Sequence, residues 1–82
     1  MRVEEVDEPV QVGAVFKGGK VLPRWFVWAG VRHDVSSVNM VWKGKAGEAP
    51  LSYFSVSSGG SVWQLRLDHK SMEWRLEKVC SE

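Results

Sequence analysis

The side chains of this sequence that could carry out chemistry are two histidines, one cysteine and a scatter of serines. His33 is followed by Asp34, and Asp68 is followed by His69. Neither pair predicts a catalytic dyad, because neighbours on a strand point to opposite faces and neighbours in a turn are usually exposed. The G-x-S-x-G pattern of a serine nucleophile is absent. With no nucleophile, base and orienting group at a recognisable spacing, the sequence predicts a protein that is not an enzyme.

Metal and cofactor sites are not predicted either. The histidines and Cys80 stand at no metal-ligand spacing. The stretch KGGKV, residues 17–21, lacks the G-x-x-x-x-G-K-[ST] spacing of a phosphate loop and leads into a predicted strand. We therefore expect no cofactor and no metal. Asp68 is interpreted as a turn residue that accepts hydrogen bonds from backbone amides.

Length and composition favour one small domain in a reducing compartment. The chain has 82 residues, five tryptophans and a single cysteine. No disulfide can form within the chain, so the core must supply the stability, and the tryptophans are its largest source of buried area. No apolar run approaches the ~20 residues of a membrane span, and the acidic N-terminus lacks the apolar stretch of a signal peptide. These features favour a cytoplasmic protein.

The middle of the chain combines basic and aromatic residues. In the stretch RWFVWAGVRHDV, residues 24–35, four large apolar residues stand in a row. Alternation along a strand places Phe26 and Trp28 on one face and Trp25 and Val27 on the other. We expect the first pair in the core. The second pair, with the basic residues of the region, gives a candidate binding surface: Lys17, Lys20, Arg24, Trp25, Val27, Arg32, Lys43 and Lys45.

Three interpretations of the Trp25–Val27 face remain open. An exposed apolar strand flanked by charges is typical of a protein interface, with another protein or a second copy of the chain. A basic groove with an aromatic side chain is typical of modules that bind single-stranded nucleic acid. The acidic N-terminal residues 1–9 could instead fold over Trp25. The sequence favours a protein-interaction or self-association module, with single-stranded nucleic-acid binding as the alternative and no role at a membrane.

The apolar pattern predicts an all-β fold. Alternation and glycine-containing turns predict a six-stranded antiparallel meander curled into a small barrel or roll, with residues 1–9 as a flexible acidic arm and 10–80 as a single β domain. Pro23 marks either an edge position or a bulge in the second strand, and we favour the bulge because Trp28 then lies opposite Val31. Apolar positions change from odd to even around Ser36–Ser37, which predicts a bulge or bend there. The predicted strands are 10–17, 21–28, 31–42, 51–56, 62–67 and 72–79.

Cross-strand registers follow from the turns. A turn at Ala29–Gly30 sets Trp28 opposite Val31 and Trp25 opposite Asp34. A four-residue loop at 68–71 sets Leu67 opposite Met72 and Arg66 opposite Glu73. After the bend, Val38, Met40 and Trp42 are expected on one face. The predicted core is Phe26, Trp28, Phe54, Val56, Trp63, Leu65, Met72, Trp74 and Leu76.

The order of the aromatic residues resembles that of a family of small bacterial proteins of unknown function. The pattern is F-x-W-x-G, then a tryptophan, then YF-x-V, and finally W-x-L. Relatives in that family are sometimes encoded near error-prone repair polymerases, so the resemblance implies a link to DNA repair or replication. It covers residues 10–79 and implies a fold but no catalytic residues. The matching residues are Phe26, Trp28, Gly30, Val35, Trp42, Tyr53, Phe54, Val56, Leu65, Asp68, Trp74 and Leu76.

Overall fold

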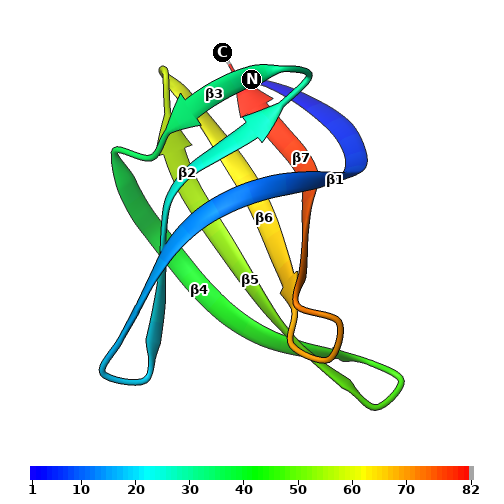
Figure 1. Cartoon of the computed structure of the whole chain (residues 1–82). Coiled ribbons are helices and arrows are strands. Elements are labelled where there is room, and N and C mark those ends of the chain that lie inside the picture. The colour runs from blue at the N-terminus through cyan, green and yellow to red at the C-terminus, as the bar shows by residue number, and fades with distance from the viewer. Residues whose placement is uncertain (82) are drawn as a thin grey trace.

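The computed structural model describes residues 1–81, which form one antiparallel sheet of seven strands (Figure 1). Because these residues form no helix, none of them provides a membrane-spanning helix. The sheet order is β3-β2-β1-β7-β6-β5-β4. The strands are β1 (Arg2–Lys17), β2 (Lys20–Trp28), β3 (Val31–Asp34), β4 (Ser37–Ala46), β5 (Ala49–Ser58), β6 (Ser61–Asp68) and β7 (Glu73–Ser81).

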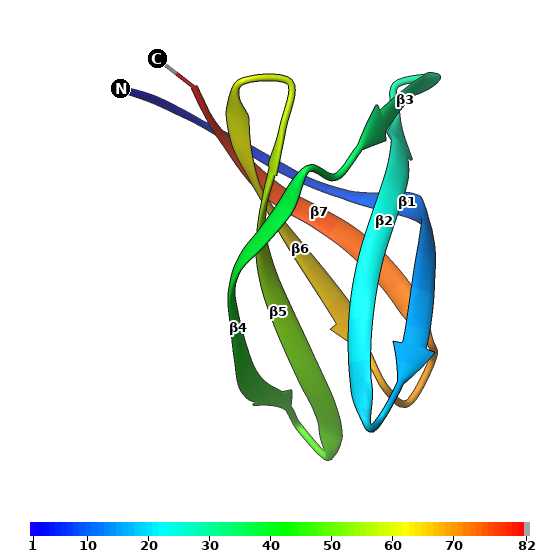
Figure 2. The same ribbon diagram turned by 90° about the vertical axis from the view of Figure 1, so that its left-hand side faces the viewer.

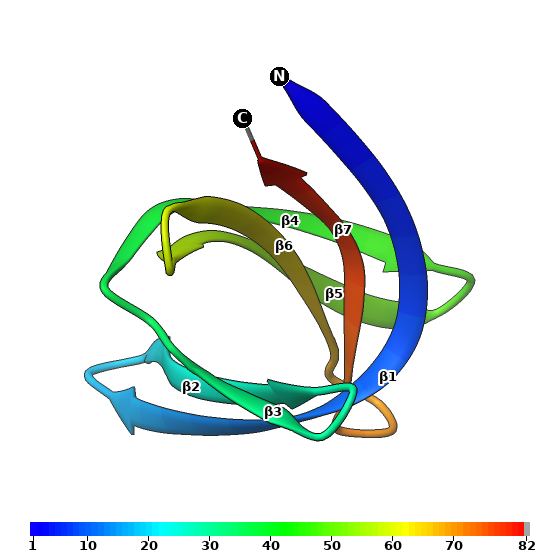
Figure 3. The ribbon, with the colours of Figure 1, turned by 90° about the horizontal axis from the view of Figure 1, so that it is seen from above.

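The all-β antiparallel prediction is confirmed, but the strand count and the closure are not. The predicted third strand, residues 31–42, is two strands, β3 and β4, so residues 1–81 contain seven strands and not six. The first and last strands pair with each other, and β3 and β4 become the two sheet edges. The sheet therefore curls without closing into a barrel. Seen from above, the chain between β3 and β4 links its two sides (Figure 3).

The break between β3 and β4 lies at the predicted bend. The Val35 amide donates a hydrogen bond to the Arg24 carbonyl of β2 at 2.8 Å. The next amide, Ser36, donates to the Ser57 carbonyl of β5, also at 2.8 Å. Val35 and Val38 both pack against the core. Successive amides thus bond to opposite sides of the curled sheet, which confirms the predicted bend.

The hairpin of β2 and β3 has the predicted register. Trp28 pairs with Val31 and Trp25 with Asp34. Ala29 and Gly30 both have positive φ, 52° and 75°, as a two-residue turn of this kind requires. A bulge at Arg24, where the register with β1 shifts, decides which side chains of β2 face the core. This confirms the predicted bulge next to Pro23.

Strand β1 crosses the molecule and pairs on both sides. Its first half, from Arg2 to Val10, pairs with β7, and Gln11 to Lys17 pair with β2. Between Glu5 and Glu8 the register shifts, and Asp7 adopts a φ of 51°. The acidic segment predicted as an arm is therefore part of the sheet from Arg2 onward.

The core lies inside the curl of the sheet. His33 stacks on Phe26 with ring centroids 5.0 Å apart. The ring centroid of Trp63 lies 4.5 Å from that of His33 and 5.2 Å from that of Phe26. These contacts join β2 and β3 to β6. Trp28 and Trp74 pack against the same cluster as predicted. The buried cluster is Phe26, Phe54, Val56, Trp63, Leu65, Leu67, Leu76 and Val79.

The predicted register of β6 and β7 is wrong by two residues from Leu65 to Asp68, and by three beyond the register shift at Gln64. Leu67 pairs with Trp74 and Leu65 with Leu76, so Met72 is not opposite Leu67. Met72 is a turn residue with φ of 60° and is 55% exposed. A shift by two keeps each side chain on its face, which is why the rest of the predicted core survives.

The same shift changes the ion pair. Arg66 lies across from Arg75, not Glu73. Its Nη1 donates to Glu77 Oε2 at 3.0 Å, and both side chains are mostly buried. The register of β6 with β7 shifts between Gln64 and Leu65, so that Glu77 lies within hydrogen-bonding reach of Arg66.

A bulge in β4 decides which of its side chains face inward. The register with β5 shifts between Val38 and Met40. Beyond the shift Val41 pairs with the buried Phe54, so Val41 and not Met40 faces inward. Trp42 turns outward and stacks on Tyr53 at 5.4 Å. The prediction that Met40 and Trp42 share the face of Val38 is therefore wrong.

The corrected register predicts different costs for two truncations. Trp74→Ala removes a ring whose centroid lies 5.4 Å from that of Phe54. It should lower the free energy of unfolding by about 3 kcal/mol, the low end for large core deletions, because the ring is only half-buried. Met72→Ala should change it by less than about 0.5 kcal/mol. Urea unfolding of both variants checks this, and a large loss for Met72→Ala would contradict the register.

Candidate functional site: an open cleft between β2 and β4

A cavity of about 500 Å³ opens where β2 and β4 face each other, and we call it the cleft. Figure 2 shows β4 and β2 on opposite sides of the curled sheet, and residues of both strands line the cavity. The volume is within the range of ligand sites in proteins. No acidic residue is among the residues described around it. They are Gly19, Lys20, Val21, Leu22, Val38, Val41, Lys43, Ser52, Phe54 and His69.

The cleft exists because two strand edges lack a neighbour. β3 pairs only with Trp25–Trp28, so the first half of β2 has β1 on one side and no strand on the other. β4 has β5 on one side and is the last strand of the sheet. A free edge exposes unpaired N–H and C=O groups. On the cleft face of β4 the apolar side chain of Val41 is also uncovered, with 49% of its surface exposed.

A chain of three polar side chains lies in the cleft. Lys43 Nζ donates to Ser52 Oγ at 3.1 Å, and Ser52 Oγ lies 2.7 Å from His69 Nε2. An ammonium can only donate, so Ser52 accepts from Lys43, while the hydroxyl can either donate to or accept from the His69 ring nitrogen. Ser52 is 1% exposed, His69 is half-buried and Lys43 is exposed.

Sheet register and one turn position these three groups. Lys43 and Ser52 are cross-strand partners on β4 and β5, on the face that Val41 and Phe54 also share. His69 is held by its amide, which donates to the Pro50 carbonyl at 3.0 Å. Asp68 orders the turn, since its Oδ1 accepts from the Lys70 amide at 2.8 Å and the Ser71 amide at 3.2 Å. This confirms the predicted role of Asp68.

Asp68, in the turn between β6 and β7, makes the free energy of unfolding depend on pH. Hydrogen bonds from the Ser71 and Lys70 amides hold the pKa of Asp68 below its ordinary value of 3.8. Because the pKa of Asp68 is lower in the folded than in the unfolded protein, its carboxylate stabilises the fold at pH values above the unfolded-state pKa. This stabilisation is lost as the pH falls through the folded-state pKa. Asp68→Asn should therefore be less stable than wild type near pH 7, with a smaller difference at about pH 2. Urea unfolding at both pH values checks this, and an equal difference at both would contradict it.

The Ser52–His69 pair lacks what nucleophilic catalysis requires. A serine nucleophile must reach a substrate carbonyl, and a third group normally orients the base. Ser52 is nearly inaccessible. Within residues 1–81 no hydrogen bond involves Nδ1 of His69. The cleft instead combines apolar walls with a few convergent polar groups, as binding sites do.

The predicted surface residues fall into two groups. One lies on the outer face of β2 and β3. The Trp25 indole occupies the space beside Gly13 of β1, where a Cβ atom would clash with it, and the Arg32 guanidinium lies 4.9 Å from its ring centroid. Arg32 also pairs with Asp34 at 2.9 Å. Trp25 is therefore on the face opposite Phe26, as predicted, and is partly covered by these neighbours, which do not belong to residues 1–9. Val27 is half-buried beside Arg32 on this face.

The lysines form the second group, around the cleft. Lys20 and Lys43 line it. Lys17 pairs with Lys20 at the β1–β2 hairpin, and Lys45 lies two residues beyond Lys43 on β4. Arg24, at the β2 bulge, is exposed. The aromatic and the lysine groups predicted as one surface are therefore two surfaces.

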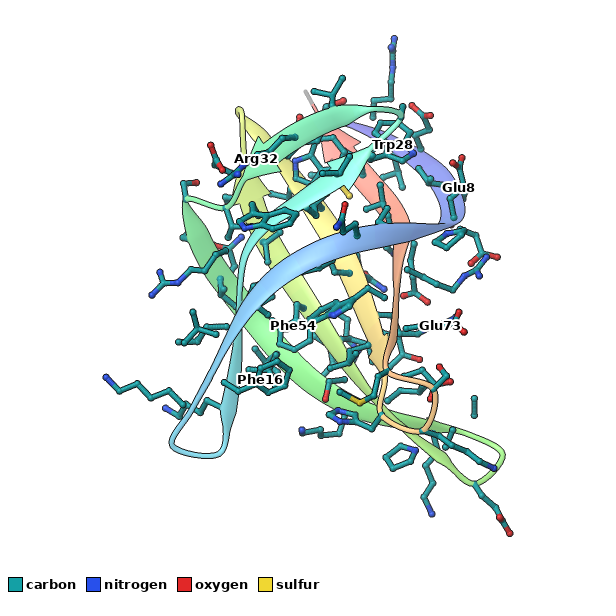
Figure 4. The ribbon with its side chains drawn as sticks, viewed as in Figure 1. Glu8, Phe16, Trp28, Arg32, Phe54 and Glu73 are labelled. Atoms are coloured by element: carbon teal, nitrogen blue, oxygen red, sulfur yellow. The ribbon has the colours of Figure 1, made fainter. Side chains whose placement is uncertain are left out.

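Sequence reasoning missed Ser52 and His69 as cleft residues. They are far apart in the chain and meet only because the β6–β7 turn bonds to the start of β5. Phe16 pairs with Val21 of the cleft, so its side chain lies on the cleft side of β1. It is nevertheless 60% exposed, beside the β1–β2 hairpin (Figure 4).

Comparisons of the chain with protein-family models, with curated proteins and with solved structures found no match. The resemblance of the aromatic pattern to small bacterial proteins stays a prediction. Function must be argued from the cleft alone.

Proposed function

We propose that this protein is a non-enzymatic interaction module that binds an extended segment of a partner protein in the cleft, as an added strand along β4. The observation that carries the proposal is the pair of free strand edges, on β2 and β4, that face each other across an apolar cavity. An extended peptide can pair with such an edge through main-chain hydrogen bonds while alternate side chains enter the groove.

The regular part of β4 suits strand addition. After the register shift at Asn39, Met40 to Ala46 pair with β5 without interruption. A strand added on the other edge would place every second side chain over the cleft, next to Val41 and above Phe54. It would thus cover apolar surface that is exposed in the free protein.

Charge indicates the chemistry of the partner. Lys20 and Lys43 line the cleft, Lys45 follows on β4, and no acidic side chain of the described residues lines it. None of these lysines forms an ion pair within residues 1–81. A segment with both apolar and acidic side chains complements this surface.

Strand addition is tested with a neutral peptide, acetyl-Thr-Val-Thr-Gln-Thr-Val-Thr-amide, at millimolar concentration. Bound peptide should slow amide exchange in β4 beyond Asn39 and shift resonances of Val21 and Leu22 in NMR spectra. Val41→Lys places a charge in the cleft and should weaken binding at least about tenfold. Met40→Lys is the matched control, because Met40 points away from the cleft, and it should bind as wild type does.

Two outcomes would overturn the proposal. One is protection of amides elsewhere, with β4 unchanged. The other is a dimer by light scattering that Val41→Lys dissociates, because β4 would then already be paired with a second copy.

A second candidate, single-stranded nucleic-acid binding, is favoured by Phe16. This exposed aromatic ring precedes Lys17 at the hairpin, on the same side of the sheet as Val21 of the cleft. An exposed ring among lysines is what a base-stacking groove requires. Trp25 suits this role less well than the sequence suggested, since Arg32 already lies over its ring.

A labelled oligothymidine measures this candidate. If bases stack on Phe16, Phe16→Ser should lower the binding free energy by about 1–3 kcal/mol, as loss of one stacking residue does. Trp25→Ser should leave binding unchanged, because its face is separate from the cleft. Affinity should fall steeply as salt rises. Equal losses for the two variants, or no binding at low salt, would exclude the role of Phe16.

A further inference from the structure

We infer that Lys43, Ser52 and His69 form a subsite for one carboxylate, and that the segment bound in the cleft places an acidic side chain there. The inference rests on the proposed function, because it names which residue of the added strand the cleft selects. Sequence motifs did not indicate this subsite, since its members meet only in the folded sheet.

The geometry of the three side chains resembles a built binding site more than a chance surface contact. Ser52 is nearly fully buried and hydrogen-bonded to both neighbours, at 3.1 Å to Lys43 Nζ and 2.7 Å to His69 Nε2. Holding the ammonium and the imidazole on one hydroxyl removes rotational freedom that each would otherwise lose on binding. Ser52 is therefore a positioning residue, and Lys43 and His69 are the groups that meet the ligand.

The subsite has N–H groups that can donate hydrogen bonds to a ligand. An ammonium has three N–H groups, and within residues 1–81 only one hydrogen bond from Lys43, the one to Ser52, is formed. A carboxylate would accept from the others with a charge-assisted bond. The Lys43 ammonium brings one positive charge to the subsite, which one carboxylate neutralises. This charge balance favours a carboxylate.

Sheet register then gives the pattern of the bound segment. On the cleft face of β4, Val41, Lys43 and Lys45 follow one another at every second position. Directly opposite side chains on neighbouring strands are in contact. The added strand should therefore present an acidic residue opposite Lys43 and an apolar residue opposite Val41, two positions away. This requirement holds whichever direction the strand runs.

The test compares three peptides that differ in the central residue. Acetyl-Thr-Val-Thr-Glu-Thr-Val-Thr-amide should bind about tenfold more tightly than its Gln counterpart, and the Lys counterpart should bind more weakly still. Lys43→Gln should abolish the preference for Glu over Gln. Lys45→Gln is the matched control, since Lys45 shares the face of Lys43 without contacting Ser52, and should keep it. Ser52→Ala should reduce the preference while circular dichroism stays unchanged.

A second arm uses small anions, so that the subsite is judged separately from strand addition. Titration with acetate should shift the His69 ring and Lys43 side-chain resonances in wild type but not in Lys43→Gln. Tighter binding of inorganic phosphate than of acetate would overturn the carboxylate assignment. Equal binding of the Glu and Gln peptides along β4 would overturn the subsite and leave the proposed function intact. If no peptide binds, the proposed function fails, and the inference that rests on it fails too.

Discussion

The fold depends on two successive amides that bond in opposite directions. Val35 donates to β2 and Ser36 donates to β5, so the chain fastens the two sides of the curled sheet together at one point. Ser58 Oγ adds a bond to the Asp34 carbonyl at 2.6 Å beside it. Away from this point no hydrogen bond between β2 and β4 is among the pairings described for residues 1–81. The sheet is fastened at one end and open at the other.

The open end explains how so small a chain keeps a cavity. The aromatic contacts of Phe26, His33 and Trp63 fill the fastened end of the curl. Trp28, labelled in Figure 4, lies there with its ring centroid 5.8 Å from that of Trp63. Toward the β1–β2 hairpin the cavity opens beside Gly19 and Lys20, and Phe16 is left exposed. Closure of the sheet would remove both free edges, and with them the means of adding a strand. Stability and binding thus use different ends of one sheet.

Bulges decide which side chains line the cleft. The shift at Asn39 turns Val41 and Lys43 inward and sends Trp42 out to stack on Tyr53. Without it, Lys43 would face the other side and could not reach Ser52, because a shift of one residue reverses every side chain of a strand. A single extra residue therefore creates the polar chain of the cleft.

The sequence by itself determined the all-β class, the positions of most strands and turns, and most of the core, because alternation and glycine turns are local signals. It also placed Trp25 and Phe26 on opposite faces. Only the tertiary structure decided that the lysines and Trp25 belong to separate surfaces, that Met72 lies in a turn, and that Ser52 meets His69. Strand order, the bulge at Asn39 and the register across the 68–72 turn depend on contacts between residues far apart in the chain. No local pattern encodes those contacts, so the cleft became visible only in the folded sheet.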